Sequence, residues 1–373
     1  MIFSSIIIPT FNRAASLQHT LTSLLQLSIG AERFEVIVID NGSTDSTNQV
    51  VLEVIEKHPL HQVRYIYDPE PGLLTGRHRG ALEARGELLT FVDDDIVASP
   101  DWLTAIVQTF EDSSVQLVGG RNLPRYEVPP PPWLKGFWWI PPSGGQACGS
   151  LSLLNMGDAQ RDIDANYIWG LNFSIRQQAL FDLGGFHPDC IPEALQHFQG
   201  DGETGLTIQA TERGYRAVYQ PAAIVYHCVP AGRLTPEYFQ RRAYFQGVCD
   251  SYTTMRRQGG LAPPVPEQPP TEESGLHRLG RYARHPLLHS CNLVRRLFPK
   301  PKPLPPVAIV EEAELNQIRH GVESAYRSGY AFHQHAVRDM PGLIDWVLRE
   351  DYWDYRLPKL AGPPPSQSQG QSS

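Results

Sequence analysis

Apolar runs and amphipathic segments alternate over the first 120 residues of the chain. Short apolar runs, typical of buried strands, lie at residues 3–8, 34–40, 63–68 and 87–93. The segments between them carry apolar residues three and four positions apart, as helices do, at residues 15–27, 48–57 and 75–85. Strands that are apolar throughout and alternate with helices favour a parallel sheet with helices on both faces. The pattern therefore predicts an α/β fold.

The pattern is less regular farther along the chain. It predicts a strand and a helix within residues 167–186, helices over 204–214 and 236–256, and short strands over 217–220 and 223–227. Residues 126–145 combine prolines with tryptophans and predict no regular element. They form either a buried structural loop or an aromatic wall for a sugar ring or a lipid. Helical spacing returns over residues 311–338.

Composition and charge narrow the class of protein. The 373 residues are 41% hydrophobic, enough for a real core, and the net charge of −8 argues against a nucleic-acid partner. The five cysteines are scattered without a CxxC pair, which fits reduced thiols better than a disulfide framework. The N-terminus lacks the features of a signal peptide, and no run approaches about 18 apolar residues. We therefore expect a cytoplasmic protein.

Acidic residues gather where the predicted strands end. Asp40, Asp68 and the triplet at 93–95 each follow an apolar run. In a parallel sheet these strand ends share one edge, beyond which ligands bind. If the strand continues through the triplet, Asp93 and Asp95 point to one side of it and Asp94 to the other. Two carboxylates on one side suit Mg²⁺ or Mn²⁺ acting on a phosphorylated substrate.

An isolated acidic triplet is as well explained by capping of the next helix, with Ser99 and Asp101. Here the triplet accompanies further motifs: SIIIPTFNR, FEVIVIDNGSTDST, GRHRGALEARGELLTFVDDD, GLNFSIRQQALFDLGGF and AVYQPAAIVYH. With these motifs in this order and spacing, over roughly residues 3–230, the chain resembles family 2 glycosyltransferases of the GT-A fold. The resemblance implies a mostly parallel sheet sandwiched by helices, a nucleotide-sugar donor, a DxD metal site and, usually, inversion at the anomeric carbon.

The resemblance also assigns donor contacts to particular residues. Pro9, Thr10 and Asn12 match the first-strand motif that contacts the nucleotide. Asp40 matches the acid that bonds the base or the ribose, and Arg77 matches the arginine of the family's ARNxG segment. These five residues are therefore expected to line the donor site.

The same comparison assigns the metal ligands. Asp93 and Asp95 match the two acids of DxD, and Asp93 and Asp94 are expected beside the donor. His227 matches a histidine that is a third metal ligand in some relatives, although a histidine at a strand end can also be capped by a loop. The chain departs from the family pattern at His78, which replaces the usual asparagine of ARNxG.

The residue that matches the catalytic base lies in the segment GDGETGL, residues 200–206. Alignment on the following helix places Glu203 on the base position, with Asp201 just before it as the alternative. A carboxylate here accepts the proton of the acceptor hydroxyl as its oxygen attacks the sugar. The segment also matches the dinucleotide pattern GxGxxG, but no strand precedes it and its acids would repel a pyrophosphate, so we reject NAD binding.

Five parts of the chain are predicted from these features. The expected parts are a nucleotide-sugar binding half (1–125), an acceptor-binding and catalytic half of the same GT-A domain (126–256), a Pro-rich and basic linker (257–310), a C-terminal helical segment (311–357) and a disordered tail (358–373).

Two other functions stay open at this point. A sugar-phosphate nucleotidyltransferase also uses acids on a divalent ion, but the chain has PTFNR where those enzymes have a Gly-rich basic loop. A non-catalytic sugar-binding protein on a degenerate transferase fold is suggested only by the GDGE segment, where family members usually have a Glu-Asp pair. The leading hypothesis remains a metal-dependent glycosyltransferase.

The partners can be predicted only by class. A UDP-sugar is the expected donor because UDP is the commonest nucleotide in the family that the chain resembles, and the expected acceptor is a saccharide or a lipid-linked glycan. Residues 276–302 are basic, free of acids and interleaved with leucines, as in a segment that lies on a membrane surface. The alternative is that these arginines pair with acids of the same chain, including Glu311, Glu312 and Glu314.

Overall fold

The fold is built on one 11-stranded sheet in a computed structural model that describes residues 3–260 and 306–358. The main strand order is β3-β2-β1-β4-β10-β6-β11-β5. Four parallel neighbours form its N-terminal half: β1 (Ser4–Thr10), β2 (Phe34–Asp40), β3 (Gln62–Tyr67) and β4 (Leu88–Phe91). This half is the parallel sheet that the apolar runs predict.

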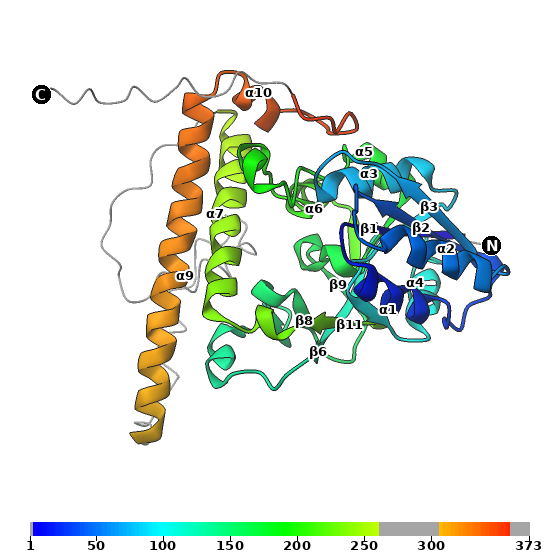
Figure 1. The fold of residues 1–373 in the computed structure, drawn as a ribbon, viewed down its shortest axis with the longest axis horizontal. Coiled ribbons are helices and arrows are strands. Elements are labelled where there is room, and N and C mark those ends of the chain that lie inside the picture. Colours follow the sequence, from blue (N-terminus) through cyan, green and yellow to red (C-terminus); the bar gives the residue numbers. More distant parts are fainter. Residues whose placement is uncertain (1–2, 261–305, 359–373) are drawn as a thin grey trace, which may run out of the picture.

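Helices cover both faces of the sheet, as Figure 1 shows. One face carries α1 (Ala14–Leu24), α2 (Thr47–Lys57) and α4 (Trp102–Thr109), and the other carries α3 (Leu73–Glu83), α5 (Gln177–Asp182) and α6 (Glu203–Glu212). Side chains of β1 alternate between the two cores: Ile6 and Ile8 belong to the first, and Ile7 belongs to the second. The predicted α/β fold is confirmed.

The second half of the sheet is mixed. Its strands are β5 (Ile96–Ala98), β6 (Val115–Tyr126), β7 (Gln146–Cys148), β8 (Leu153–Asn155), β9 (Arg161–Ile163), β10 (Phe173–Arg176) and β11 (Arg216–Val229). β6 and β11 are parallel, whereas β10 runs antiparallel to both β4 and β6. The two strands predicted at 217–220 and 223–227 are one strand, because a register shift between Gln220 and Ile224 accommodates Pro221 without ending the ladder.

Short 3-10 helices connect the longer elements. They lie at Ala31–Arg33, Pro132–Phe137, Gly149–Leu151, Ala165–Tyr167, Gly170–Asn172, Glu193–Phe198 and Ala231–Arg233.

The proline- and tryptophan-rich loop, residues 126–145, contains the 3-10 helix Pro132–Phe137. Trp133 and Phe137 of this helix are buried against Phe239, with ring centroids 5.0 and 4.8 Å from it. These two side chains therefore fit the structural-loop alternative.

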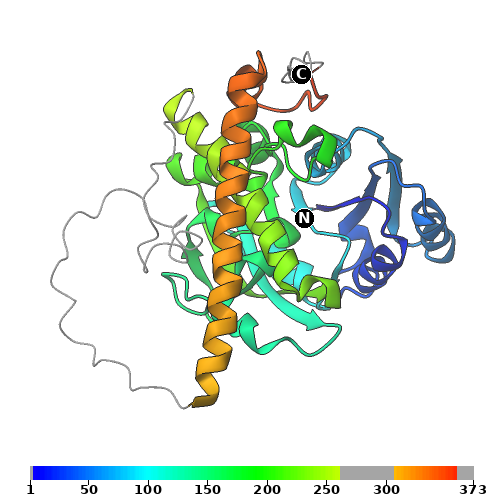
Figure 2. The ribbon, with the colours of Figure 1, turned by 60° about the vertical axis from the view of Figure 1, so that its left-hand side comes forward.

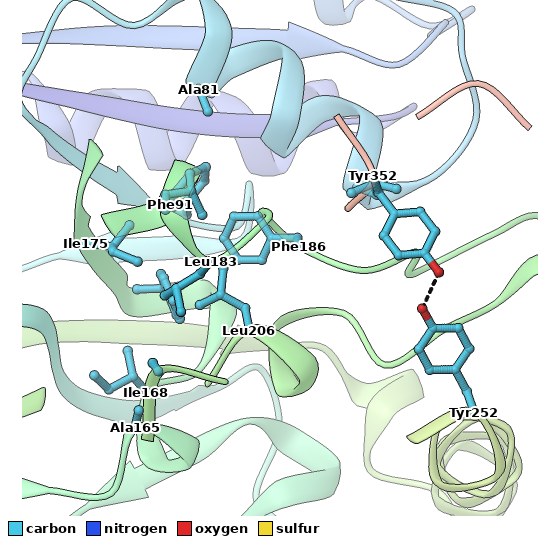
Figure 3. Packing of buried hydrophobic residues seen from close by; sticks show 14 of the residues in the cluster. Ala81, Phe91, Ala165, Ile168, Ile175, Leu183, Phe186, Leu206, Tyr252 and Tyr352 are labelled. Carbon is cyan, nitrogen blue, oxygen red and sulfur yellow. Dashed lines mark hydrogen bonds between the residues drawn. The ribbon is translucent and has the colours of Figure 1, made fainter. Parts of the chain in front are cut away.

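Two long helices, α7 (Pro236–Gln258) and α9 (Pro306–Asp339), run side by side in the same direction (Figures 1 and 2). The helix predicted over 311–338 is thus confirmed, and it begins earlier, at Pro306. After α10 (Leu343–Val347) the chain returns to the core of the sheet. Figure 3 shows Tyr352 of this returning segment joined to Tyr252 of α7 through their hydroxyl groups. We call residues 340–358 the C-terminal strap.

Several predictions fall outside what the structure describes or tests. The basic stretch 276–302 and the tail from residue 359 onward lie outside the described residues, so the membrane contact and the disordered tail stay predictions. Across residues 3–260 and 306–358, no helix has both the length and the apolar character needed to cross a bilayer. The cysteines within those ranges, Cys148, Cys190, Cys228 and Cys249, are free thiols.

Candidate active site

The predicted nucleotide contacts meet at the carboxyl edge of the parallel strands. Thr10 ends β1 and Asp40 ends β2, and the Asn41 backbone N–H donates to the Thr10 carbonyl at 2.9 Å. Asn12, whose φ is 53°, accepts hydrogen bonds from the backbone N–H groups of Thr44 and Asp45. The left-handed Asn12 thereby ties the loop after β1 to the loop after β2.

Asp40 is buried and already bonded within the protein. The Ser43 backbone N–H donates to its Oδ1 and the Tyr65 hydroxyl donates to its Oδ2, both at 2.7 Å. Burial and the bond to this carboxylate raise the pKa of Tyr65 to about 12. Pro9 lies against Gly76 of α3, where a Cβ would come within 2.6 Å of the proline ring. Gly76 therefore lets α3, which carries Arg77, approach β1 closely.

The acidic triplet is not part of a strand, so the condition under which Asp93 and Asp95 would point to one side is not met. β4 ends at Phe91, and the triplet lies in the turn before β5. Strand alternation therefore does not decide where the three carboxylates point. Asp94 accepts a 2.7 Å hydrogen bond from the Thr10 hydroxyl, and its other oxygen lies 3.3 Å from the Arg13 Nε.

Burial changes the pKa values of the acids in this turn. It raises the pKa of Asp94 to about 7, with the charge of Arg13 opposing the rise. It also raises the pKa of Asp93, and the negative charge of Asp95 adds to that effect while Arg77 opposes it. Acids packed this closely require positive charge beside them, because each buried carboxylate is costly when unpaired.

Two arginines supply positive charge to Asp95. Arg13 and Arg233 both donate to its Oδ2 at 2.8 Å. Oδ1 is buried and accepts no hydrogen bond from the described residues, and His227 Nε2 lies 3.5 Å from it. His227 Nδ1 donates to the Leu151 carbonyl at 2.8 Å, which leaves Nε2 with the lone pair that accepts from Arg233 at 2.6 Å.

These groups have the chemistry of a divalent-metal site. An orphaned carboxylate oxygen on Asp95 and an imidazole nitrogen of fixed tautomer on His227 are both suitable ligands, and Asp93 is close enough to influence both electrostatically. As the side chains stand, no three His, Cys, Asp or Glu residues in the described ranges converge tightly enough to enclose an ion. Arginines bond two of these groups instead: Arg13 and Arg233 both reach Asp95, and Arg233 also reaches His227.

Glu203 is the first residue of α6 and faces the same region. Its Oε2 lies 3.1 Å from Arg77, and its Oε1 accepts from the Gly170 backbone N–H at 3.1 Å. Burial alone would raise the pKa of Glu203, but the charge of Arg77 and these hydrogen bonds hold it below its ordinary value. A Cβ on Gly170 would come within 2.0 Å of the Arg77 guanidinium, so the glycine permits this arrangement. Glu203 is thus ionised and a quarter of its side chain is exposed.

Asp201 differs from Glu203 in both exposure and bonding. Only 1% of its side chain is exposed. Its two oxygens lie 2.6 Å from His187 Nδ1 and 2.6 Å from the donating hydroxyl of Thr253. Burial opposes its ionisation, but these partners hold the pKa of Asp201 below the ordinary value. Asp201 therefore links the turn before α6 to His187 and to Thr253 of α7, and both of its oxygens are engaged in these buried contacts.

His78, the departure from the family motif, is also committed to the protein interior. The Phe186 backbone N–H donates to its Nε2 at 2.8 Å, so Nδ1 carries the proton and donates to the Tyr352 carbonyl at 2.9 Å. Burial lowers the pKa of His78 to about 3. The side chain therefore holds the C-terminal strap against α3.

The segment that matches GxGxxG does not follow a strand. Residues 193–198 before it form a 3-10 helix, and Gly202 has a φ of 60°. A Cβ on Gly205 would come within 2.0 Å of the His187 ring. These glycines serve the turn and the packing around α6, consistent with the rejection of dinucleotide binding.

Sequence reasoning missed Arg13, Arg233 and Gly170. Arg13 lies inside a recognised motif, but no role was assigned to it, and Arg233 follows the last motif by a few residues. The signal that could have found them is charge balance, because three adjacent acids at a buried strand end require cations nearby. Gly170 has no such signal, since its backbone N–H makes the contact.

Comparisons with known proteins identify the family and relatives of the chain. Residues 5–180 match the family model described as Glycosyl transferase family 2. Glycosyltransferase AglE of Haloferax volcanii is 27% identical over 240 residues, which cover 64% of this chain and 71% of that protein. Glucosyl-dolichyl phosphate glucuronosyltransferase of the same organism is 23% identical over 248 residues, 65% of this chain and 74% of that protein.

A solved structure also shares the fold. Mannosyltransferase PcManGT from Pyrobaculum calidifontis, in complex with GDP-Man and Mn²⁺, aligns with a TM-score of 0.50 at 18% identity, covering 95% of this chain and 85% of that one. At this identity the likeness concerns the fold alone. The names of the relatives favour glycosyl transfer over the nucleotidyltransferase and non-catalytic alternatives.

Proposed function

From the premise that this chain is a glycosyltransferase whose residues 5–180 belong to family 2, we propose that it moves a sugar from a nucleotide-diphosphate donor to a hydroxyl acceptor by direct displacement. The observation that carries the proposal is the position of Glu203. This ionised, partly exposed carboxylate lies in the same site as the acidic triplet, within the electrostatic reach of Asp93.

We assign Glu203 as the base. Its carboxylate accepts the proton of the acceptor hydroxyl while that oxygen bonds to the anomeric carbon. The bond from that carbon to the donor phosphate breaks, and the nucleoside diphosphate leaves. One displacement of this kind inverts the anomeric configuration. Arg77 keeps Glu203 ionised and oriented, whereas the buried bonds of Asp201 favour a structural role for it.

We further propose that Asp93, Asp95 and His227 hold Mn²⁺ or Mg²⁺. The free Asp95 Oδ1 and the fixed tautomer of His227 support this assignment. A bound divalent ion would stabilise the negative charge that develops on the departing diphosphate. The solved relative is a complex with Mn²⁺, by its description.

The donor site comprises Pro9, Thr10, Asn12, Asp40, Arg77 and Asp94 in this proposal. A UDP-sugar is the first donor to test, and GDP-mannose, the donor in the solved relative, is the rival. A saccharide or lipid-linked acceptor fits the relative that acts on a dolichyl phosphate glycan. Melting curves with UDP-sugars and with GDP-mannose, each with and without Mn²⁺, would identify the donor by the largest metal-dependent stabilisation.

Replacement of Glu203 by Gln tests the base assignment. The amide keeps the shape of the side chain but cannot take a proton, so we expect turnover to fall by roughly 10²-fold or more while donor binding is retained. Turnover is measured as Mn²⁺-dependent release of nucleoside diphosphate from the preferred donor, with water as acceptor.

The matched variant is Asp201→Asn. It should lower the free energy of unfolding, because His187 and Thr253 lose a charged partner, and should spare most of the turnover of the folded molecules. An inactive but folded Asp201→Asn beside an active Glu203→Gln would move the base two residues upstream. Absence of donor hydrolysis with every donor would contradict the proposed activity.

A further inference from the structure

Arg233 bridges two of the side chains assigned to the metal. One nitrogen of its guanidinium donates to Asp95 Oδ2 at 2.8 Å, and another donates to His227 Nε2 at 2.6 Å. Only 19% of the side chain is exposed. The planar guanidinium can reach both atoms at once, which a single ammonium group cannot do as well.

The bond to His227 excludes a metal at the same atom. Because Nδ1 donates to the Leu151 carbonyl, Nε2 offers a single lone pair. Arg233 uses that lone pair in this structure, and a metal ion would need the same one. Arg233 and a metal are therefore mutually exclusive at His227.

We infer that Arg233 is a resident counter-ion that has to leave His227 before a divalent metal can bind there. The inference rests on the proposed metal assignment, and it adds that Arg233 competes with the metal for His227. The guanidinium holds Asp95 and His227 in place while no ion is present and keeps affinity for a free ion low. It is a positioning residue that acts through its two partners.

The surroundings allow this exchange without loss of the fold. Arg13 donates to the same Asp95 oxygen at 2.8 Å, so Asp95 keeps a cationic partner when Arg233 departs. The backbone at Arg233 is fixed independently, since its N–H donates to the Pro230 carbonyl at 2.9 Å. The exchange therefore needs rotation of one long side chain.

A nucleoside diphosphate is the ligand whose chemistry draws Arg233 away. Its phosphate oxygens offer a guanidinium a bidentate partner at the edge of the same site. Donor and metal should then bind with positive coupling, because each removes an obstacle to the other, and the coupling must be reciprocal. Metal affinity should accordingly be weak without nucleotide and higher with it.

The test measures Mn²⁺ affinity of the full chain by the electron paramagnetic resonance of free Mn²⁺, without nucleotide. We expect Arg233→Gln to bind Mn²⁺ about tenfold more tightly than wild type or better, since a charge-assisted competitor is removed. Arg233→Lys keeps the positive charge but cannot bridge both atoms, so it should also bind more tightly than wild type. This variant separates release of the His227 lone pair from a general loss of positive charge.

Arg241→Gln is the matched control, because Arg233 and Arg241 lie over the same Tyr238 ring, at 6.0 and 5.5 Å from its centroid, while Arg241 is exposed and contacts no member of the acidic triplet. It should leave Mn²⁺ affinity unchanged. Addition of UDP or GDP should raise the affinity of wild type more than that of Arg233→Gln. Wild-type affinity equal to or higher than that of both Arg233 variants would overturn the inference and leave the metal site standing. Absence of Mn²⁺ binding in all proteins, with and without nucleotide, would overturn both.

Discussion

His78 shows how one residue can link the catalytic region to the end of the chain. The family motif has asparagine at this position, and the histidine here accepts from Phe186 and donates to Tyr352. Trp353 stacks on its ring with centroids 4.3 Å apart. Arg77, the residue before His78, donates a hydrogen bond to Glu203. One turn of α3 therefore contacts both the strap and the candidate site. The departure from the family motif therefore has a structural explanation in the strap.

The buried state of His78 makes stability depend on pH. Burial lowers its pKa to about 3, whereas an unfolded histidine titrates near 6.5. Below about pH 6.5 the unfolded chain binds a proton that the folded chain does not, so this residue's contribution is complete above that pH. It is lost at about 1.4 kcal/mol per pH unit as the pH falls toward 3.

The variant His78→Asn should be less stable than wild type at neutral pH but should lose less stability on acidification. Urea unfolding at about pH 7 and about pH 5 measures both effects. His333, whose pKa burial lowers to about 4, is present in both proteins and cancels in the difference. Parallel pH dependences of the two proteins would show that His78 is not the source.

At the scale of elements, α7 and α9 approach each other at glycines. A Cβ on Gly329 of α9 would come within 1.9 Å of the Tyr244 carbonyl oxygen, and one on Gly247 of α7 within 2.0 Å of the Tyr326 carbonyl oxygen. These contacts are with backbone atoms, which cannot be displaced without moving the helix that contains them. The glycines therefore set the separation of the two helices.

Gly329→Ala should accordingly destabilise the protein by about 1–3 kcal/mol, because the added methyl group forces the helices apart. Gly321→Ala on the same helix is the control. Its Cβ would meet the Gln240 side chain, which can rotate away, and alanine favours the helix by up to about 1 kcal/mol. Urea unfolding of both variants is the measurement, and equal effects would contradict the close-packing argument.

The sequence predicted the elements whose pattern is local. Apolar periodicity predicted the strands β1 to β3 and the helices between them. The positions of Asp40 and Asp68 at strand ends followed from where the apolar runs stop. The turn at Asp93–Asp95 was misjudged because the apolar run gives no sign of where pairing stops. The strap could not be foreseen, since its contacts with His78 and Tyr252 join positions distant in the chain.

Only part of the candidate site could be predicted, because many of its contacts also join residues that are distant in the chain. The roles of Asp40, Glu203 and His227 were assigned from the resemblance alone; the structure has Asp40 at the end of β2, Glu203 at the start of α6 and His227 within β11. The different environments of Asp201 and Glu203 depend on which helix each side chain meets, and alignment alone cannot supply that. The roles of Arg13 and Arg233 depend on charge pairing across the fold, which becomes visible only when the partners are placed.

At the scale of the whole molecule, the C-terminal strap completes the core of the sheet. Leu343, Trp346, Val347 and Tyr352 are almost fully buried in the cluster that contains Phe91. The Tyr355 hydroxyl donates to Asp68 at 2.7 Å, so the strap also reaches the carboxyl end of β3. The end of the described chain therefore supports the edge where the donor is proposed to bind.

A chain that stops after Asp339 should consequently fail to fold stably. Burial of the four large strap side chains is worth about 1.5–3 kcal/mol each, and their sum rivals the 5–15 kcal/mol that typically stabilises a whole domain. A chain that stops after Pro358 keeps every one of these contacts and should melt at the same temperature as the full chain. Trp346→Ala provides a milder version, for which we expect a loss of about 3–5 kcal/mol in one cooperative transition. Calorimetry of the three proteins would decide the matter: if the chain ending at Asp339 melted like wild type, the strap would be an appendage, and the position of Arg77 would have to be secured by α3 alone.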